Sequence, residues 1–437
     1  AQPFGCVQGS PPTPAGGVEA EVVVVTGGGQ ARDYRGLRVK GKFVLTDTAA
    51  GSVHQEAQKQ GAVGVISDAM ATNPVVRKDP MDLPDALLWQ VMRPAGALPA
   101  FVLSPRQGKW LRGLIARRTA EGATVRVRAR VDARVYDGRL EMVSGLLRGR
   151  SDQEVALMAH FAEPGANDNA SGAGLCVEIA RALQALIKAG KLSRPRRGLR
   201  VWLTHEVYSL QAHAVTDPQA MARVVAAHNL DMVGEDMARC GSVLMYQDSP
   251  DAAPSFINHL LRELLEHFRR GFHAWPNLSS SQAFFPALET PFWGNDNFIS
   301  DPSIGVPSVA FINWPDRYYH TSEDTPDKLS AETLARAGAL AATFVYTIAN
   351  AGKSEAVVLA EMVAAQAPAL LEREVTAQAA KARDALAEEQ DDLDERLAHG
   401  LNRLEYLRQR ELAALRSVNV LLSATESKQI APRLGEL

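Results

Sequence analysis

The stretch Gly165-Ala166-Asn167-Asp168-Asn169-Ala170-Ser171-Gly172 decides the fold, and His160 lies eight residues before its aspartate. The run 154–159 just upstream is short and apolar, which predicts a buried strand that ends at His160. Open α/β sheets bind their ligands at this end of a strand. Apolar residues recur at helical spacing over 172–186, so Asp168 lies just before a predicted helix. A carboxylate there can bridge two metal ions, although a simple capping turn also accounts for the stretch taken alone.

Three more segments bring metal-binding residue types to the ends of apolar runs. The segment 200–206 ends in a His-Glu pair, the run 224–234 carries an aspartate near its end, and 314–329 contains Tyr-Tyr-His. One histidine or aspartate at a strand end is usually structural, but five in this order indicate a site. Two imidazoles and three carboxylates suit a pair of zinc ions, each with a position left open for water. The candidate metal ligands are His160, Asp168, Glu206, Asp231 and His320.

These motifs resemble the co-catalytic di-zinc exopeptidases, a family that includes secreted bacterial leucine aminopeptidases and the peptidase domain of glutamate carboxypeptidase. The resemblance covers about residues 150–350. It implies an α/β fold with a mixed, mostly parallel sheet flanked by helices, the zinc exopeptidase fold. Its most specific pieces are Gly165–Gly172, Asn229–Met232, Tyr319–Thr321 and Asp324–Asp327.

The resemblance also implies roles for individual residues. Asp168 bridges both zinc ions and is followed by a cis peptide bond. His160 and Asp231 complete one metal site, and His320 belongs to the other. Tyr319 hydrogen-bonds the developing oxyanion.

The chain departs from the family pattern after the third motif. Relatives carry two adjacent glutamates there, the first a general base and the second a metal ligand, whereas this chain has His205 and Glu206. In one alignment Glu206 is the ligand and His205 replaces the base. An alignment by the following residues 209–213 makes Glu206 the base and removes a ligand from the second metal. A carboxylate can do either job, so both assignments stay open.

A second departure lies beside His160. Relatives often have an aspartate two residues further on that orients the imidazole, and this chain has Ala162 there. Loss of such a carboxylate weakens metal affinity, unless Glu163 substitutes for it.

Metal-assisted hydrolysis is the reaction that this set of residues predicts. Glu206 or His205 accepts the proton of a metal-activated water, and Tyr319 and the metal stabilise the oxyanion. We expect a peptide substrate with a free N-terminus, which makes the chain an aminopeptidase. A carboxypeptidase, for which Arg317 would hold the terminal carboxylate, a zinc cyclase, or a metal-free receptor-like relative are the alternatives. The predicted substrate pocket consists of Phe292, Trp293, Ile304 and Arg317.

The region before the peptidase motifs has its own pattern of short elements. Strands are predicted at the end of 37–47, over 61–67, 99–104 and 124–131, with helices over 53–60 and 107–116. Lys-Gly-Lys followed by apolar residues resembles the protease-associated domain that accompanies this family, although a plain stabilising module fits equally. We therefore expect an extended lead over 1–20, a β-rich protease-associated domain over 21–135 and a zinc peptidase domain over 136–352.

The last segment, 353–437, is rich in Ala, Leu, Glu and Arg. Its leucines recur mostly at three- and four-residue spacing, which predicts an amphipathic helical hairpin. Packing on the catalytic domain is the favoured arrangement, and a homodimer formed through these helices is the alternative.

Global features bound the remaining possibilities. A chain of 437 residues predicts two to three domains, and a net charge of −3 without a dense basic patch argues against nucleic acid. No apolar run approaches membrane-spanning length. A secreted, periplasmic or cell-envelope location is expected, with a signal peptide removed. Of the three cysteines, Cys176 is expected in the core, and a Cys6–Cys240 disulfide stays open.

Overall fold

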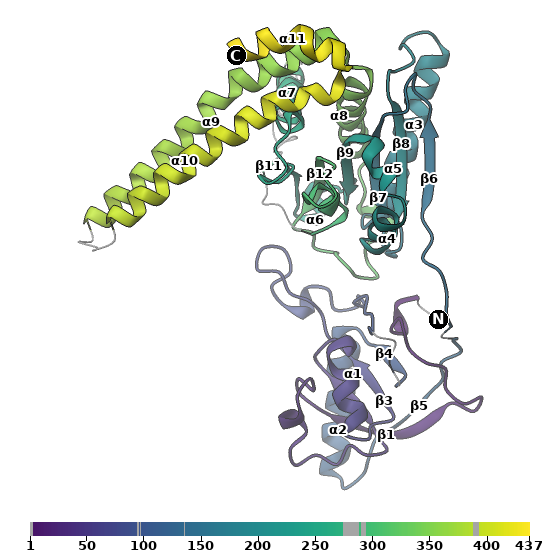
Figure 1. Cartoon of the computed structure of the whole chain (residues 1–437). Coiled ribbons are helices and arrows are strands. Elements are labelled where there is room, and N and C mark those ends of the chain that lie inside the picture. Colours follow the sequence, from purple (N-terminus) through teal and green to yellow (C-terminus); the bar gives the residue numbers. More distant parts are fainter. Residues whose placement is uncertain are drawn as a thin grey trace. The chain divides into compact units, whose positions relative to one another are not determined.

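The computed structural model describes residues 3–93, 96, 98–134, 136–273, 288–289, 294–387 and 393–437. Its contacts divide the chain into two compact units (Figure 1). Unit 1 contains Ala1–Arg139, Asp236–Ser242 and Pro315–Lys328, and unit 2 contains Leu140–Glu235, Val243–Trp314 and Leu329–Leu437. Two short segments from within the predicted peptidase region therefore belong to the unit built by the N-terminal residues.

Unit 1 is built on a five-stranded sheet with the order β4-β3-β2-β1-β5. Strands β1 to β4 are parallel and β5 pairs antiparallel with β1. The central strands β2 and β3 are buried along their whole length, which explains their apolar sequences. The elements are η1 (Pro3–Gly5), β1 (Val18–Val24), η2 (Ala31–Tyr34), β2 (Phe43–Thr46), α1 (Ala50–Lys59), β3 (Gly64–Ser67), η3 (Pro80–Asp82), β4 (Ala100–Val102), α2 (Pro105–Ala120), β5 (Arg126–Ala129), α6 (Met237–Cys240) and η6 (Pro326–Lys328).

Strands and helices predicted for this region are confirmed, with bounds shifted by a few residues. The predicted lead also contributes to the fold, because Val7 is buried and its backbone N–H donates to the Ala100 carbonyl. No disulfide joins Cys6 and Cys240, which both lie among the described residues. Cys176, in unit 2, is fully buried as expected, and burial raises the pKa of its thiol.

Unit 2 is built on a seven-stranded sheet with the order β11-β10-β12-β9-β7-β8-β6. The four central strands, β12, β9, β7 and β8, are parallel, whereas β6 and β10 run antiparallel to their neighbours β8 and β12. The elements are β6 (Val143–Leu147), β7 (Glu154–His160), α3 (Ala170–Lys188), β8 (Gly198–Thr204), α4 (Tyr208–Thr216), α5 (Pro218–Arg223), β9 (Val224–Asp231), β10 (Val243–Gln247), α7 (Phe256–His273), β11 (Leu288–Glu289), η5 (Asp296–Ser300), β12 (Ser308–Trp314), α8 (Ala331–Asn350), α9 (Lys353–Ala387), α10 (Leu393–Arg416), η7 (Ser417–Leu421) and α11 (Ala424–Glu436).

Helices cover both faces of this sheet, and β7 shows how the sequence arranges it. Val155, Leu157 and Ala159 point to the face covered by α3 and α8, and Ala156 and Met158 point to the face covered by α4, α5 and η5. Successive side chains of a strand alternate between faces, so residues 155–159 of β7, which are covered on both sides, are all apolar. The predicted mixed, mostly parallel α/β fold is confirmed.

The chain reverses its direction of travel across the sheet at β7. From β7 it crosses through α3 to β8 on one side, and then returns through α4 and α5 to β9 on the other side of β7. Neighbouring crossovers that lie on opposite faces leave a crevice at the carboxyl ends of the strands between them. The carboxyl ends of β7 and β9 are His160 and Asp231.

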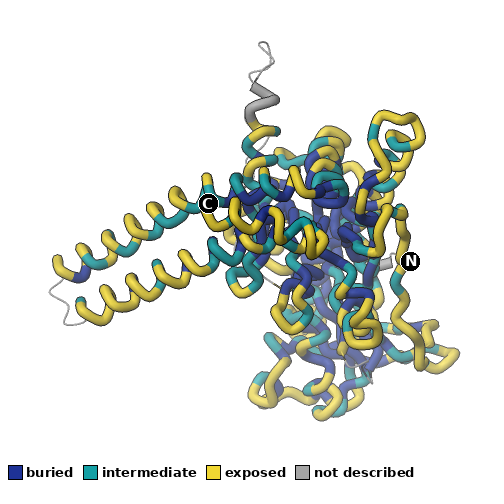
Figure 2. Tube along the Cα trace, turned by 45° about the horizontal axis from the view of Figure 1, so that its top comes forward, coloured by how far each residue is buried: buried dark blue, intermediate teal, exposed yellow. Residues whose placement is uncertain are grey.

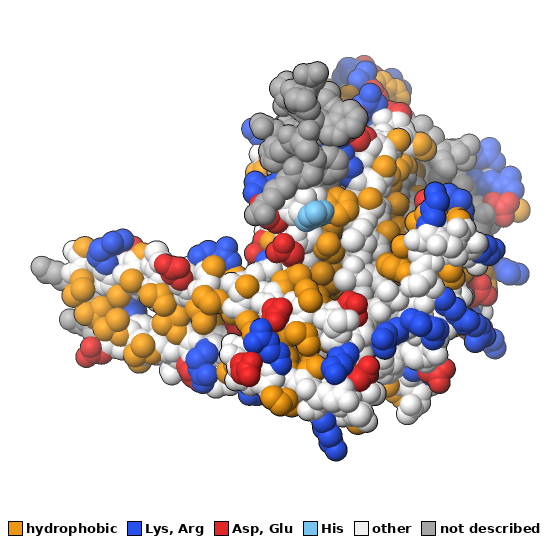
Figure 3. Space-filling view, turned by 90° about the horizontal axis from the view of Figure 1, so that it is seen from above, with side chains coloured by type: hydrophobic (Ala, Val, Ile, Leu, Met, Phe, Trp, Pro, Cys, Tyr) orange, Lys and Arg blue, Asp and Glu red, His pale blue; other side chains and the backbone are white. Residues whose placement is uncertain are grey.

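The C-terminal segment forms a helical arm. The helices α9 and α10 run side by side as a hairpin that extends away from the sheet, and α11 packs back on α9 (Figure 1). Buried residues concentrate around the sheet, whereas the far part of the arm carries mostly exposed and half-buried ones (Figure 2). Hydrophobic side chains lie along the arm among charged ones (Figure 3). The exposed large apolar residues of α9 and α10 are Val358, Val375, Leu386, Leu397, Leu401 and Tyr406.

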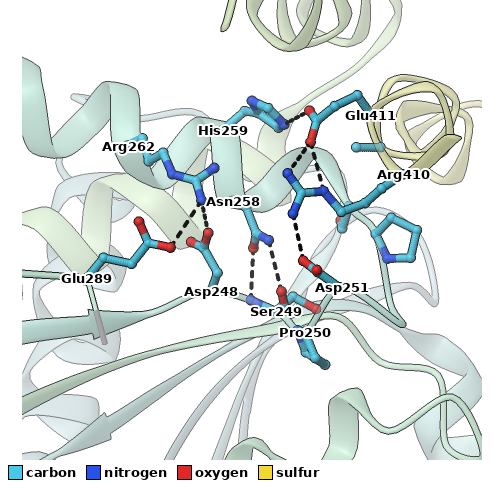
Figure 4. A pocket seen from close by; sticks show the side chains of 13 residues that line it. Asp248, Ser249, Pro250, Asp251, Asn258, His259, Arg262, Glu289, Arg410 and Glu411 are labelled. Atoms are coloured by element: carbon cyan, nitrogen blue, oxygen red, sulfur yellow. Dashed lines mark hydrogen bonds and ion pairs between the residues drawn. The ribbon is translucent and has the colours of Figure 1, made fainter. Parts of the chain in front are cut away.

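A network of charged and polar side chains, buried at His259 and Glu411, joins the arm to the body of unit 2 (Figure 4). His259 of α7 contacts Glu411 of α10 at 2.9 Å, and Arg410 contacts the same carboxylate at 2.6 Å. Arg410 also reaches Asp251 at 2.6 Å. These residues line a cavity at the edge of the sheet opposite to the carboxyl ends of β7 and β9, because Asp248 follows β10, which runs antiparallel to β12.

Two described helices, α3 and α9, are long and apolar enough to cross a membrane by length and composition alone. The apolar face of α3 packs in the core of unit 2 with Leu175, Ile179 and Leu183. A helix with one buried face is what the interior of a globular domain requires.

Candidate metal centre

Four of the predicted ligands converge at the carboxyl ends of three adjacent strands of unit 2. His160 ends β7 and Asp231 ends β9, while Glu206 follows β8 by two residues. The Nε2 atom of His160 lies 3.1 Å from Oδ1 of Asp168 and 4.0 Å from Oδ1 of Asp231. Donor atoms of His160, Glu206 and Asp231 lie within 4.8 Å of one another. The structure therefore brings together His160, Asp168, Glu206 and Asp231.

The Asn-Asp-Asn-Ala-Ser-Gly turn is joined to the end of β9 through Asn169. Its Oδ1 accepts hydrogen bonds from the backbone N–H groups of Gly172 and Met232, and its Nδ2 donates to the Leu230 carbonyl. Asn169 is also the N-cap of α3, so the capping interpretation of the turn is confirmed and coexists with the site. The peptide bond between Asp168 and Asn169 is cis, as the family resemblance implies.

Close packing requires glycine at the end of this turn. A Cβ atom on Gly172 would lie 2.0 Å from the Leu230 carbonyl oxygen, far inside van der Waals contact. The hydroxyl of Ser171 adds a second link, because it accepts a hydrogen bond from the Val233 N–H at 3.1 Å. Asn169, Ser171 and Gly172 thus help to hold that carboxylate beside Asp231.

The carboxylates of Asp168, Glu206 and Asp231 concentrate negative charge around His160. Burial raises the pKa of Asp231 well above its ordinary value, and Asp168, Glu206 and Asp296 raise it further against the opposing effect of His160. Burial alone would lower the pKa of His160, but the attraction of Asp231, Asp168 and Glu206 raises it well above its ordinary value. Oδ1 of Asp231 is buried and makes no hydrogen bond with the residues that the structure describes. A bound cation would offset this repulsion.

The imidazole of His160 has two distinct sides. Its Nε2 faces the carboxylates, including Glu163 at 3.9 Å, so Glu163 is not placed to orient the ring through Nδ1. The Nδ1 atom faces Oδ2 of Asp296 at 3.9 Å. Asp296, at the start of η5, was not predicted from the sequence as a site residue, because it follows no apolar strand. Its position within Asn295-Asp296-Asn297, a second Asn-Asp-Asn triplet, is the signal that could have identified it.

His205 and Glu206, the two candidates for the general base, lie just after β8. The backbone N–H of His205 donates to the Ser209 hydroxyl at 2.6 Å, and its ring meets Tyr208 edge-on at 6.2 Å. Its Nδ1 is buried without a hydrogen bond. Glu206 belongs to the donor cluster with His160 and Asp231, which is the position expected of a ligand. The assignment of base and ligand stays a prediction.

Tyr319, His320 and Arg317 belong to unit 1. The rings of Tyr319 and His320 stack at 3.7 Å between centroids, and the His320 carbonyl accepts a hydrogen bond from the Trp89 N–H. Arg77 donates to the carbonyls of Arg317 and Tyr319, and the Arg317 guanidinium donates to the Asp82 carbonyl. Their roles in binding metal, oxyanion or substrate stay predictions.

Two residues with positive φ adjoin the predicted ligands. Among the described non-glycine residues only Met232, at 54°, and His320, at 57°, have a positive φ. Such backbone is uncommon and clusters at functional sites. One of these residues directly follows Asp231, and the other is itself a predicted ligand.

The other predicted pocket residues are Phe292, Trp293 and Ile304. Phe292 and Trp293 lie outside the described residues. Ile304 packs against the apolar cluster on the α4 and α5 face of the sheet, beside Trp202 and Leu210. Its role in substrate binding stays a prediction.

The donor set fits zinc. One imidazole nitrogen and three carboxylates, all brought to the carboxyl ends of parallel strands, are ligand types that zinc accepts. The buried Oδ1 of Asp231 has no hydrogen-bond donor among the described residues, as expected of a carboxylate oxygen that coordinates a metal ion.

Comparisons with known proteins also indicate similarity to metallopeptidases. Residues 143–345 match the profile of Peptidase family M28. A segment of 213 residues is 27% identical to the aminopeptidase YwaD of Bacillus subtilis (strain 168) and covers 46% of this chain and 41% of that protein. The match thus spans less than half the length of this curated relative.

Solved structures share the fold at low sequence identity. BSAP, a zinc aminopeptidase from Bacillus subtilis, aligns with a TM-score of 0.55 and 20% identity over 78% of this chain and 77% of that one. A Peptidase M28 precursor from Shewanella amazonensis SB2B aligns with a TM-score of 0.50 and 18% identity over 79% and 77%. These likenesses show the fold.

Proposed function

We propose that the protein is a zinc-dependent aminopeptidase of Peptidase family M28, whose profile residues 143–345 match. The observation that carries the proposal is the convergence of His160, Asp168, Glu206 and Asp231 on one buried spot. The names of the relatives, an aminopeptidase and a zinc aminopeptidase, support the activity and the metal. We expect two zinc ions, for which Asp168 and His320 would also serve as ligands, as the family resemblance implies.

The mechanism is hydrolysis of the first peptide bond of a substrate with a free N-terminus. These ligands would hold zinc, which when bound would supply a water of lowered pKa and polarise the scissile carbonyl. Glu206 or His205 accepts the water proton and passes it to the leaving amine. Tyr319 donates a hydrogen bond to the oxyanion that develops.

The first test measures metal and substrate together. Zinc per chain is determined by elemental analysis, and turnover is measured on aminoacyl anilides, N-blocked peptides, peptides that begin with glutamine and peptides that report C-terminal cleavage. The proposal expects cleavage of the free aminoacyl substrates, loss of activity with a chelator and recovery with zinc. A chain without stoichiometric zinc and without turnover would instead be a receptor-like relative, and turnover of the glutamine peptides alone would make it a cyclase.

A pair of substitutions separates base from ligand. If Glu206 is the base, Glu206→Gln lowers kcat by about 10²–10⁴-fold while the zinc content is unchanged. If Glu206 is a ligand, the same change lowers the zinc content, and His205→Gln instead lowers kcat with zinc retained. Asp168→Asn lowers zinc content in either case and serves as the positive control.

Three further parts of the proposal concern the rest of the chain. We propose that residues 21–135 act as a protease-associated domain that shapes substrate access. We also propose that the protein works outside the cytoplasm, as the secreted members of the exopeptidase family that it resembles do. We also propose that α9 and α10 form a homodimer contact. Exposed apolar residues along both helices support the last point.

A further inference from the structure

We propose that Asp296 is the positioning residue of His160 and takes the place of the aspartate that relatives carry two residues after this histidine. The inference rests on the proposed function, because it assigns Nε2 of His160 to the metal. It goes beyond that function by naming a residue from a distant part of the chain that fixes the tautomer and orientation of the ring.

Asp296 lies where such a residue must lie. It is fully buried, and its Oδ2 accepts a hydrogen bond from the Thr204 hydroxyl at 2.7 Å and lies 3.9 Å from Nδ1 of His160. The side chains of β7 alternate between the two faces of the sheet, so His160 points to the same face as Met158. That face is the one covered by η5, which begins at Asp296.

The protonation of the ring requires an acceptor on this side. Nε2 faces Asp168, Asp231 and Glu163, so a metal held by those carboxylates binds Nε2 and leaves the ring proton on Nδ1. Histidine ligands of metals nearly always donate this second N–H to a carboxylate or carbonyl. Residue 162, the usual source, is alanine in this chain.

Asn169 also faces Nδ1, but it presents a donor. Its Nδ2 lies 3.4 Å from Nδ1 of His160. The orientation of this amide is set by three hydrogen bonds, since its oxygen accepts from two backbone N–H groups and its nitrogen donates to a carbonyl. Flipping the amide would break all three. Asp296 is therefore the acceptor that the Nδ1 proton can reach with a small movement of either side chain.

The surroundings of Asp296 favour this role over a purely structural one. A buried carboxylate needs a partner that compensates its charge. Its Oδ2 accepts a hydrogen bond from the Thr204 hydroxyl at 2.7 Å and lies 3.9 Å from Nδ1 of His160. Its Oδ1 makes no hydrogen bond with the described residues. The imidazole of His160 is thus the ionisable group placed to compensate the charge of this carboxylate.

The test compares zinc affinities, measured by competition with a chromogenic chelator. Asp296→Asn keeps the size of the side chain and removes its charge, and we expect the zinc affinity to fall about 10–100-fold, the cost typical of losing such a partner. The matched control is Asp301→Asn, which removes an exposed carboxylate just after the same 3-10 helix and should leave the affinity unchanged. Adding Ala162→Asp to Asp296→Asn should restore most of the lost affinity.

A second readout follows the ring itself. In zinc-loaded protein labelled with ¹⁵N-histidine, the Nδ1 proton of His160 should exchange slowly in the wild type and at least tenfold faster in Asp296→Asn. If Asp296→Asn does not fold, Thr204→Val, which releases Asp296 without removing it, should lower the zinc affinity at least threefold.

The outcomes separate the two proposals. A wild-type chain that binds no zinc contradicts the proposed function. A wild type that binds zinc, together with unchanged affinity in Asp296→Asn, or in Thr204→Val where that variant is needed, overturns the role of Asp296 alone. Equal losses in Asp296→Asn and Asp301→Asn, failure of Ala162→Asp to restore affinity, or unchanged proton exchange overturn it too.

Discussion

At the scale of single residues, the turn around Asp168 is held by contacts that leave no room for a methyl group at Gly172. Gly172→Ala would place a Cβ 2.0 Å from the Leu230 carbonyl oxygen, so α3 or β9 must move. We expect a loss of about 1–3 kcal/mol in the free energy of unfolding, as for other overpacked sites, and weaker zinc binding. Chemical denaturation and zinc titration measure both.

Gly174→Ala is the matched control for that change. It lies two residues along the same helix, and nothing lies within 4 Å of its added Cβ. Alanine has the higher helix propensity, so this variant should be as stable as the wild type or more stable by up to about 1 kcal/mol. Equal losses from both substitutions would show that the turn does not depend on close packing at Gly172.

Residues of the site could be predicted where a run of apolar residues ends in a histidine or a carboxylate. His160 and Asp231 end strands that are mostly apolar, as strands buried on both faces of a parallel sheet are. Asp296 has no such run before it and reaches the site only through tertiary packing. The candidate ligands at strand ends could therefore be predicted from the sequence, whereas the carboxylate of Asp296 beside His160 could not.

At the scale of elements, the strands and helices around the site follow from local pattern. The predicted elements over 154–159, 172–186 and 224–234 correspond to β7, α3 and β9. Their order in the sheet depends on which face each connecting helix covers, which periodicity does not encode. The same limit applies to segments 236–242 and 315–328, whose place in unit 1 depends on contacts with residues such as Arg77 and Trp89.

The contact between α7 and α10 gives a prediction that depends on pH. Burial raises the pKa of Glu411, but the hydrogen bonds with His259 and Arg410 outweigh it and lower the pKa below its ordinary 4.5. Ionised Glu411 therefore stabilises the fold above about pH 4.5, and this contribution is lost as the pH falls through the lower folded value. Glu411→Gln should lower the free energy of unfolding by about 3 kcal/mol at pH 7, because it removes the buried carboxylate that pairs with Arg410 and contacts His259.

Urea denaturation at pH 7 and pH 4 measures this effect, and the gap between variant and wild type should shrink at the lower pH. Glu405→Gln is the control, because its pair with Arg408 lies on an exposed face of the same helix, and it should change the stability by no more than about 0.5 kcal/mol. A gap that stays constant between the two pH values would mean that charge at Glu411 does not hold the arm.

At the scale of the whole molecule, the arm offers a surface for a second copy. Leu397 and Leu401 are 46% and 68% exposed and lie one turn apart on α10. We expect a dimer by analytical ultracentrifugation, and Leu397→Glu with Leu401→Glu should convert it to a monomer, because burying the new charges is costly. The control Val215→Glu changes a residue of α4 that is 82% exposed and should keep the dimer.

The scattering of the ligands along the chain has a consequence for the protein in a cell. His160, Asp168 and Asp231 meet only when β7, α3 and β9 have assembled, so an ion held by all three binds the native form and not an opened one. Free zinc at about 100 times the dissociation constant adds about 2.7 kcal/mol against opening. Cells starved of the metal should therefore degrade this protein faster, and its lifetime would report how much zinc is available.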